Sequence, residues 1–329
     1  MLSQRLDDLA ARFAGRKILV LGDLMLDEFM RGKVSRISPE APVPVVEVLE
    51  TAHFPGGAAN VARNLCSLGA KPGLAGVIGA DEDGRLLMDL LQSEGAGVGG
   101  IVVSPQRPTT HKLRIVARQQ QVVRVDRESK APLSGEEQER LLAYLAREIA
   151  LHEAVIIEDY GKGLINQTVA AAVIRQAKEA GKIVTIDPNP HNPLDWSGAT
   201  AIKPNRQEAF QSAGRLPTDS HEDLLAVAEK LRAQWRSRYL LVTLGEEGML
   251  LLEDGKKPYH TPTKAKEVYD VSGAGDTVVA VLGLAIAAGG KMREAAMLAN
   301  LAAGIVVGKL GTATVTREEL RNAMTGGSR

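Results

Sequence analysis

The chain has 329 residues, and its 40 Lys and Arg balance 40 Asp and Glu, so its formal net charge is zero. A balanced charge gives no electrostatic attraction to nucleic acid or to an anionic membrane. The longest apolar run, residues 277–290, is shorter than the ~20 residues that span a bilayer, and residues 1–17 are charged and lack a signal-peptide core. We therefore expect a cytoplasmic protein that binds neither nucleic acid nor membrane.

The length is enough for one large α/β domain or two small ones. No internal repeat, low-complexity tract or linker interrupts the sequence, so we expect one domain over residues 1–329. The one cysteine, Cys66, excludes an intramolecular disulfide, and its apolar helical surroundings predict a buried structural thiol.

Short apolar strands alternate with helical patterns along most of the chain. Strands are expected at residues 18–21, 74–78, 101–103, 154–158, 183–186, 201–203 and 239–243. Helices are expected at residues 3–14, 61–68, 85–93, 134–150, 167–180, 277–288 and 294–308. This alternation predicts a doubly wound, three-layer α/β/α domain.

Two segments, approximately residues 28–50 and 107–127, break this alternation. Each contains a pair of β-prone stretches with no helix between them, so neither is a βαβ unit. We interpret them as insertions that form a small β-sheet lid. A lid that excludes water would suit a phosphoryl-transfer enzyme, because water competes as the acceptor.

A glycine-rich loop runs from Asp270 to Asp276 and opens the apolar helical segment. Backbone N–H groups of Gly273, Ala274 and Gly275 at a helix N-terminus are suited to hold an anion such as a phosphoryl group. Asp276 in the first turn could accept the proton of an acceptor hydroxyl. The alternative is a tight loop whose aspartate is a local helix cap.

Two further groups of polar residues lie near the N-terminal end of the chain. Asp23 and Asp27 follow the first strand, where an open sheet binds ligands, and carboxylates suit sugar hydroxyls. Gly56, Gly57 and Asn60 open the next helix and could contact the same substrate. The alternatives are a solvated loop and an ordinary loop-to-helix turn.

Candidate nucleotide contacts lie in the second half of the chain. Asn205 and Glu208 share a helical face, although the same spacing fits a capping box. Thr243, Gly245 and Gly248 lie at the end of a strand and in the turn that follows it. Asn300 lies among small residues that would leave room for adenine.

Two nucleotide-binding motifs are excluded. Residues 95–100 match G-x-G-x-x-G, but the match follows a helix and precedes a strand, the reverse of the dinucleotide-binding order. The sequence contains no G-x-x-x-x-G-K-[ST]. A dinucleotide-dependent oxidoreductase and a P-loop enzyme are therefore disfavoured.

The motif D-V-S-G-A-G-D at residues 270–276, with G-G-A-A-N-V-A at residues 56–62, resembles the two signatures of the ribokinase (PfkB) family of carbohydrate kinases. The resemblance implies a ribokinase-like fold, ATP as donor, and a homodimer formed through the lid. It also implies Mg²⁺ held through water by Asn205 and Glu208, and a monovalent cation such as K⁺ near Asp270, Ser272 and Thr312.

Within this family the chain most resembles the kinases of D-glycero-β-D-manno-heptose 7-phosphate. The matching stretches are residues 22–27, 35–46, 118–121, 124–126, 159–163 and 308–312. This resemblance implies phosphorylation at O1 to the 1,7-bisphosphate, for ADP-heptose and lipopolysaccharide core synthesis. Because the sequence ends at Arg329, we expect a kinase without a nucleotidyltransferase half.

A substrate that already carries a phosphate needs cationic residues at its far end, and the lid offers Lys112, Arg114 and Arg118. Solvated surface charges are the alternative. The sequence departs from the heptose kinases at Asn189, where they usually carry lysine. Another sugar or sugar-phosphate kinase of the family, or a non-catalytic sugar-binding regulator, therefore remains an alternative function.

Overall fold

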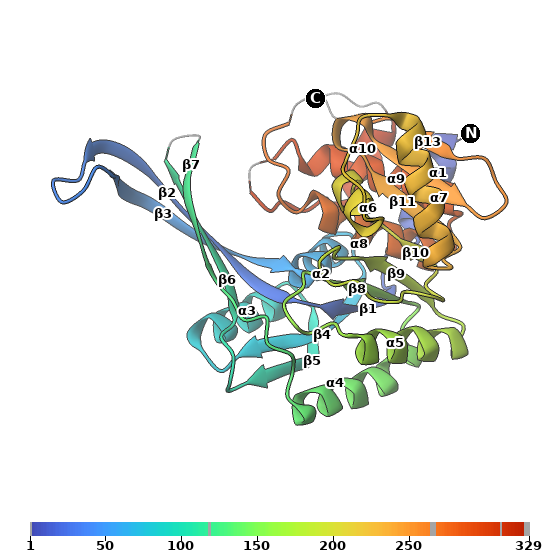
Figure 1. Cartoon of the computed structure of the whole chain (residues 1–329), viewed down its shortest axis with the longest axis horizontal. Coiled ribbons are helices and arrows are strands. Elements are labelled where there is room, and N and C mark those ends of the chain that lie inside the picture. The colour runs from blue at the N-terminus through green and yellow to red at the C-terminus, as the bar shows by residue number, and fades with distance from the viewer. Residues whose placement is uncertain (1, 118–119, 264–267, 310, 326–329) are drawn as a thin grey trace.

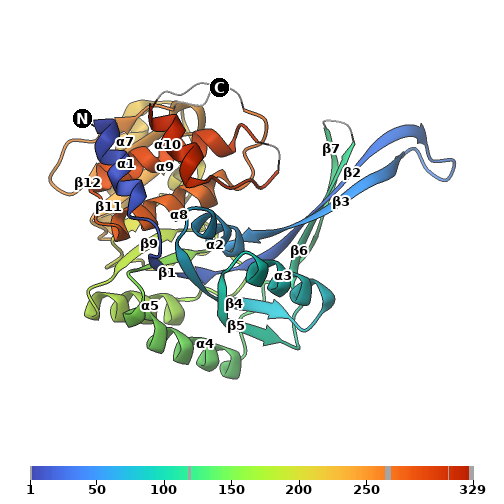
Figure 2. The same ribbon diagram turned by 180° about the vertical axis from the view of Figure 1, so that it is seen from behind.

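The computed structural model describes residues 2–117, 120–263, 268–309 and 311–325. Within these residues a nine-stranded sheet forms the centre of the body, with helices on both faces (Figure 1, Figure 2). Its strands are β1 (Lys17–Gly22), β4 (Lys71–Gly79), β5 (Gly97–Ser104), β8 (Ala154–Glu158), β9 (Ile183–Asp187), β10 (Ala201–Ile202), β11 (Tyr239–Thr243), β12 (Met249–Glu253) and β13 (Tyr259–Thr261).

The strand order is β13-β12-β11-β10-β9-β8-β1-β4-β5. The pairs from β11 to β5 are parallel, whereas β12 and β13 add an antiparallel edge. After β1 the chain builds outward through β4 and β5, then crosses to β8 on the other side of β1. A ligand site is expected beyond the carboxyl ends of the strands at such a reversal.

Two hydrophobic cores lie on the two faces of the sheet, because successive residues of a strand point to opposite sides. In β1, Ile18 and Val20 join one core, and Leu19 and Leu21 join the other. The first core is covered by α1 (Leu2–Ala11), α2 (Ala58–Ser67), α3 (Glu82–Ser93), α8 (Ala274–Ala287), α9 (Met292–Val306) and α10 (Arg317–Thr325). The second is covered by α4 (Gly135–Glu148), α5 (Gln167–Glu179), α6 (Arg206–Ser212) and α7 (His221–Gln234). The predicted three-layer α/β/α fold is confirmed.

Helix α8 is deeply buried in the first core. All its residues from Asp276 to Ala285 are buried, as expected for a helix that is apolar around its whole circumference. It packs against α2, α9 and the strands β8 and β9. Burial of the helix fixes its N-terminus, and therefore Asp276, against the ends of the parallel strands.

A second sheet of four strands protrudes from the body (Figure 1, Figure 2). It contains β2 (Leu24–Ile37), β3 (Pro44–Gly57), β6 (Thr110–Ala117) and β7 (Gln120–Arg127), in the order β3-β2-β6-β7. The β2–β3 and β6–β7 pairs are antiparallel, and β2 joins β6 in parallel. The first pair is longer than predicted, since β2 begins directly after Asp23 and β3 continues to Gly57.

The amino- and carboxyl-terminal helices meet, since Ser3 Oγ on α1 donates to the Met324 carbonyl on α10 at 3.0 Å. No helix in the described part of the chain is both long enough and apolar enough to cross a membrane. Cys66 on α2 is half-buried, and burial together with nearby Glu94 raises its thiol pKa to about 11. A thiol with so high a pKa is a poor nucleophile.

Candidate active site

A cavity of about 630 Å³ lies at the carboxyl ends of the parallel strands, beside the N-terminus of α8. Its walls come from the segments after β8, β9, β10 and β11 and from the glycine-rich loop before α8. Its volume is in the range of small-ligand pockets. Residues that are far apart in the chain, from Glu158 to Asp276, therefore meet at one place.

Asp276 is the best-placed proton acceptor in this cavity. It is 4% exposed and lies in the first turn of α8. Its Oδ2 accepts from Asn60 Nδ2 at 2.7 Å, and its Oδ1 accepts from the Tyr160 hydroxyl at 2.7 Å. Burial raises the pKa of Asp276, while these two hydrogen bonds and nearby Lys203 act in the opposite direction. The carboxylate is thus buried but held by two donors.

The loop before α8 is arranged around a left-handed glycine. Gly273 has φ +78°, and a Cβ at that position would lie 2.7 Å from Asn60 Nδ2. The Ala274 N–H donates to the Val271 carbonyl at 3.2 Å, so of the three predicted anion donors Ala274 is already engaged. The first hydrogen bond of the helix runs from the Thr277 N–H to the Gly273 carbonyl at 3.0 Å. The Gly275 N–H lies in the first turn, where backbone N–H groups have no partner within the helix.

Three charged residues that the sequence analysis did not assign to the site line the same cavity. Lys203 Nζ lies 2.7 Å from Asp187 Oδ2, and Glu158 is 1% exposed. Burial raises the pKa of Asp187 to about 7, although Lys203 opposes the rise. Burial, Asp187 and Asp276 raise the pKa of Glu158 well above its usual value. Their positions at or just after the ends of parallel strands were the signal that could have identified them.

Asp23, predicted to bind sugar, lies at the junction between β1 and the lid. It is 2% exposed, and its Oδ2 accepts from the backbone N–H groups of Tyr160 and Lys162 at 2.9 and 3.1 Å. Its Oδ1 has no hydrogen-bond partner among the described residues. Gly57, with φ +58°, brings β3 so close that a Cβ would lie 2.6 Å from the Asp23 carbonyl. One oxygen of Asp23 is therefore left for a ligand hydroxyl.

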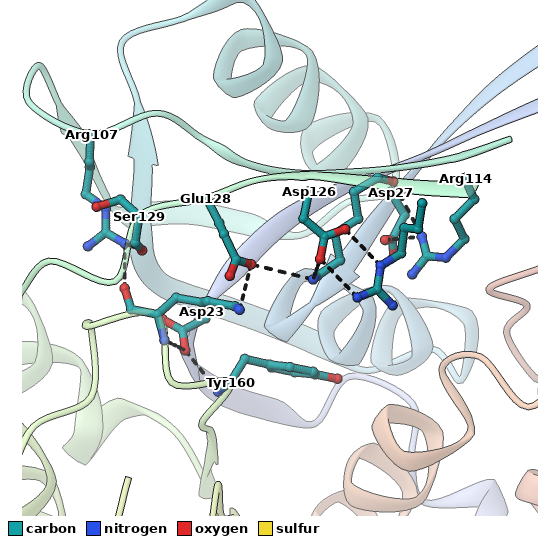
Figure 3. A network of polar contacts seen from close by, with 11 residues as sticks. Asp23, Asp27, Arg107, Arg114, Asp126, Glu128, Ser129 and Tyr160 are labelled. Atoms are coloured by element: carbon teal, nitrogen blue, oxygen red, sulfur yellow. Dashed lines mark hydrogen bonds and ion pairs between the residues drawn. The ribbon is translucent and has the colours of Figure 1, made fainter. Parts of the chain in front are cut away.

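The predicted lid cations are paired with carboxylates, as Figure 3 shows for Arg114 and Asp27. Arg114 Nη1 lies 2.5 Å from Asp27 Oδ1, and Gly56 packs so tightly against Asp27 that a Cβ would collide with its Oδ2. Lys112 Nζ lies 3.1 Å from Asp126 Oδ2. Arg118 lies outside the described residues. The expected cationic pocket is thus a network of ion pairs.

Lys162 extends this network, since its Nζ lies 2.6 Å from Glu128 Oε2. Arg107, which is 9% exposed, donates to the carbonyls of Ser129 and Lys162 at 2.9 and 2.6 Å. In Figure 3, Asp23 and Tyr160 lie below Glu128 and Asp126. The segment after β7 is therefore tied to the segment after β8.

Asn205 and Glu208 form a capping box at the start of α6. The Asn205 N–H donates to Glu208 Oε2 at 2.8 Å, and the Glu208 N–H donates to Asn205 Oδ1 at 2.9 Å. Both residues also line the cavity, as do Thr243 and Gly245. The local interpretation of the motif is therefore correct. It does not exclude a ligand, because capping uses Glu208 Oε2 but not Oε1, and one lone pair of Asn205 Oδ1.

The structure does not bring the last two predicted nucleotide contacts to the cavity walls. Gly248, with φ +96°, packs against the backbone of Thr261. Asn300 is 4% exposed and donates its amide to the Pro262 carbonyl at 2.8 Å. Asn300 thus holds the chain after β13 in place. Any effect of Asn300 on adenine binding would act through that segment.

The three predicted ligands of a monovalent cation lie on two loops that Asp270 joins. Its Oδ1 accepts from the Ser272 N–H at 2.9 Å, and its Oδ2 accepts from the Gly311 N–H at 3.1 Å. Thr312 is buried, and its Oγ1 has no hydrogen-bond partner among the described residues. A buried hydroxyl oxygen with no partner among the described residues, next in sequence to a glycine that contacts a carboxylate, fits the donor set of a hard cation. In the described part of the chain no three His, Cys, Asp or Glu side chains converge as a metal site.

A doubly wound sheet, a carboxylate at a glycine-rich helix N-terminus and a separate β-sheet lid define a ribokinase-like phosphotransferase. The model of the pfkB family of carbohydrate kinases matches residues 16–319. The chain belongs to this family and is a carbohydrate kinase.

The most similar relatives include proteins named bifunctional protein HldE. Those of Caulobacter vibrioides and Nitrosococcus oceani are 45% and 46% identical over 325 and 315 residues, which cover 97% and 95% of this chain. The aligned part is 65% and 64% of the relatives' own length, so the chain spans slightly less than two thirds of them.

Solved structures confirm the ribokinase-like fold. Arabidopsis thaliana ribokinase, complexed with ribose and ATP, superposes with a TM-score of 0.74 at 20% identity and covers 94% of this chain and 99% of its own. Escherichia coli phosphofructokinase-2, in complex with potassium, gives 0.77 at 19% identity, with 96% and 100% covered.

Proposed function

We propose that this kinase transfers the γ-phosphoryl group of ATP to O1 of D-glycero-β-D-manno-heptose 7-phosphate, giving the 1,7-bisphosphate used for ADP-heptose. Phosphoryl transfer to a hydroxyl is supported by the position of Asp276, which is buried at the N-terminus of α8 with both oxygens hydrogen-bonded. The heptose 7-phosphate is supported by the motifs shared with heptose kinases, above all residues 35–46, and by the HldE relatives.

In the proposed reaction, Asp276 accepts the proton of the O1 hydroxyl while that oxygen attacks the γ-phosphorus. A bond forms between O1 and phosphorus, and the bond from phosphorus to the departing ADP oxygen breaks. The N–H groups at the start of α8 other than that of Ala274, together with the Lys203 ammonium, would face the developing negative charge. Asp23 would offer its Oδ1, which has no hydrogen-bond partner among the described residues, to the sugar hydroxyls.

Two cations are part of this proposal. Mg²⁺ would be held through water by Asn205 and Glu208, whose side chains line the cavity and are not fully used by capping. A monovalent cation such as K⁺ would be held near Asp270, Ser272 and Thr312, where a buried hydroxyl oxygen lacks a partner among the described residues. When bound, such ions neutralise phosphate charge.

We also propose that the protein forms a homodimer through its lid. The protruding sheet carries exposed apolar side chains, among them Ile37, Leu49 and Val125, with exposed fractions of 60%, 72% and 51%. Monomeric proteins seldom expose contiguous apolar patches. A second copy of the lid would cover them.

A substrate panel tests the function. The wild-type protein with Mg-ATP should form ADP fastest with heptose 7-phosphate, when compared with the unphosphorylated heptose, ribose and fructose 6-phosphate. Asp276→Asn should lower kcat at least about 100-fold, the scale of general-base loss, while ATP binding is retained.

Three outcomes would change the assignment. A preference for another sugar would leave another kinase of the family as the function. An Asp276→Asn variant with more than a tenth of the wild-type kcat would remove Asp276 as the base. Absence of ADP formation with every sugar would favour the non-catalytic sugar-binding regulator.

A further inference from the structure

The segment after β8, residues 159–163, contacts both carboxylates on which the proposed reaction depends. Tyr160 donates its hydroxyl to Asp276 Oδ1 at 2.7 Å. The backbone N–H groups of Tyr160 and Lys162 donate to Asp23 Oδ2 at 2.9 and 3.1 Å. One short segment therefore joins the end of β1 to the start of α8.

Asn60 donates to the other oxygen of Asp276 and is itself fully buried. It is 0% exposed, its carbonyl accepts from Asn64 Nδ2 at 2.9 Å, and its amide packs against Gly273. A carboxylate offers about two lone-pair directions at each oxygen. Tyr160 and Asn60 each use one of these directions. Together they determine the plane of the carboxylate and the directions from which a sugar hydroxyl can approach it.

We infer that Tyr160 is a positioning residue, which together with Asn60 orients the Asp276 carboxylate toward the sugar hydroxyl that accepts the phosphoryl group. Through its backbone, Tyr160 also fixes the position of this carboxylate relative to Asp23. The inference rests on the proposed function, because it assigns the orientation of the base in that reaction. Tyr160 acts through Asp276 and exchanges no atom with the substrate.

The charges around Asp276 explain why a donor is needed there. Lys203 attracts the negative carboxylate, whereas Asp27 opposes its ionisation. Glu158 and Asp187 are further acidic groups in the same buried cluster. The Tyr160 hydroxyl lowers the pKa of Asp276 against the effect of burial, so its removal should raise that pKa.

Tyr160 remains protonated in this role. Burial and the neighbouring Asp276 and Glu158 raise the pKa of its phenol well above the usual value. The phenol therefore acts as a donor over the working pH range, and a more acidic phenol would be a stronger donor.

The test compares Tyr160→Phe with Tyr144→Phe, a tyrosine on α4 that packs against Gly100 far from the cavity. Tyr160→Phe should lower kcat about 10- to 100-fold, the scale of one hydrogen bond to a charged group. The acid limb of its kcat/KM profile should move to higher pH, and ATP affinity should be unchanged. Fluorotyrosine at position 160 should move the same limb to lower pH, and Tyr144→Phe should move neither.

A second measurement separates this inference from the proposed function. The ¹³C carboxyl resonance of Asp276, assigned by its loss in Asp276→Asn, can be titrated in the protein without sugar. It should titrate at higher pH in Tyr160→Phe and at lower pH with fluorotyrosine. Unchanged titration in both variants would overturn the inference, whichever sugar the enzyme uses. A wild-type enzyme inactive on heptose 7-phosphate would overturn the proposed function alone.

Discussion

Gly273 couples the backbone of the glycine-rich loop to the orientation of the base. We expect Gly273→Ala to lose stability, because its φ of +78° disfavours a side chain, and to lose activity, because the new Cβ would lie 2.7 Å from Asn60 Nδ2. Gly95→Ala is a matched control, since Gly95 has φ +86° and a Cβ there meets nothing within 4 Å.

Urea unfolding and steady-state kinetics of the two variants check this prediction. Gly95→Ala should lose about 1–2 kcal/mol of unfolding free energy, the usual cost of a left-handed alanine, and Gly273→Ala should lose at least as much because its Cβ also displaces Asn60. A large fall in kcat should occur in Gly273→Ala alone. Equal activity of the two variants would show that Asn60 can move without disturbing Asp276.

Asp159 makes the stability of the fold depend on pH. It is 6% exposed, and burial raises its pKa to about 7 from 3.8, despite hydrogen bonds from Gly161 and Asn192. Between these values the folded protein binds more protons than the unfolded chain, so the contribution of Asp159 becomes increasingly unfavourable as pH rises through this window.

Asp159→Asn removes the titrating group with little change in shape. Relative to wild type, its unfolding free energy should rise from about pH 4 to about pH 7. A pH-independent difference for Asp159→Asn would contradict the raised pKa.

At the scale of elements, strand β6 of the lid should distinguish a phosphorylated from an unphosphorylated sugar. Lys112 is half-buried between Asp126 and Glu128, at 3.1 and 3.6 Å, and a substrate phosphate could replace one of these partners. Lys112→Ala should therefore raise KM for heptose 7-phosphate about 10- to 100-fold and affect the unphosphorylated heptose less.

Lys33→Ala is the control for this experiment. Lys33 pairs with Glu47 at 3.2 Å between the same lid's β2 and β3. If both variants weaken both sugars equally, Lys112 stabilises the lid and does not contact the phosphate.

Most helices and strands could be predicted from the sequence, whereas the pairing of strands and the contacts between distant residues could not. Alternating apolar segments indicated the parallel sheet, and the missing helices indicated the lid. The parallel pairing of β2 with β6 depends on tertiary contacts that no local pattern encodes. Tyr160 was likewise missed as a contact of Asp276, because 116 residues separate them and a tyrosine in a loop carries no local signal.

At the scale of the whole molecule, the exposed lid predicts association. Leu49→Asp, at a position 72% exposed on β3, should convert a dimer into monomers, because it places a charge in the apolar contact. Leu216→Asp, at a position 86% exposed between α6 and α7, should leave the dimer intact. Sedimentation velocity at micromolar concentration distinguishes these outcomes. A wild-type monomer would exclude the proposed dimer.

The distances along the chain between contacting site residues also bear on how the protein is made. Asn60 and Asp276 are 216 residues apart, and Asp23 and Tyr160 are 137 apart. At about 5–20 residues per second, a ribosome needs roughly ten to forty seconds to add the residues between Asn60 and Asp276. Throughout that interval the nascent chain has Asn60 but no base, and its central strands lack the cover of α8. Catalytic competence therefore arises late in synthesis, and the incomplete chain exposes the apolar surface that chaperones bind.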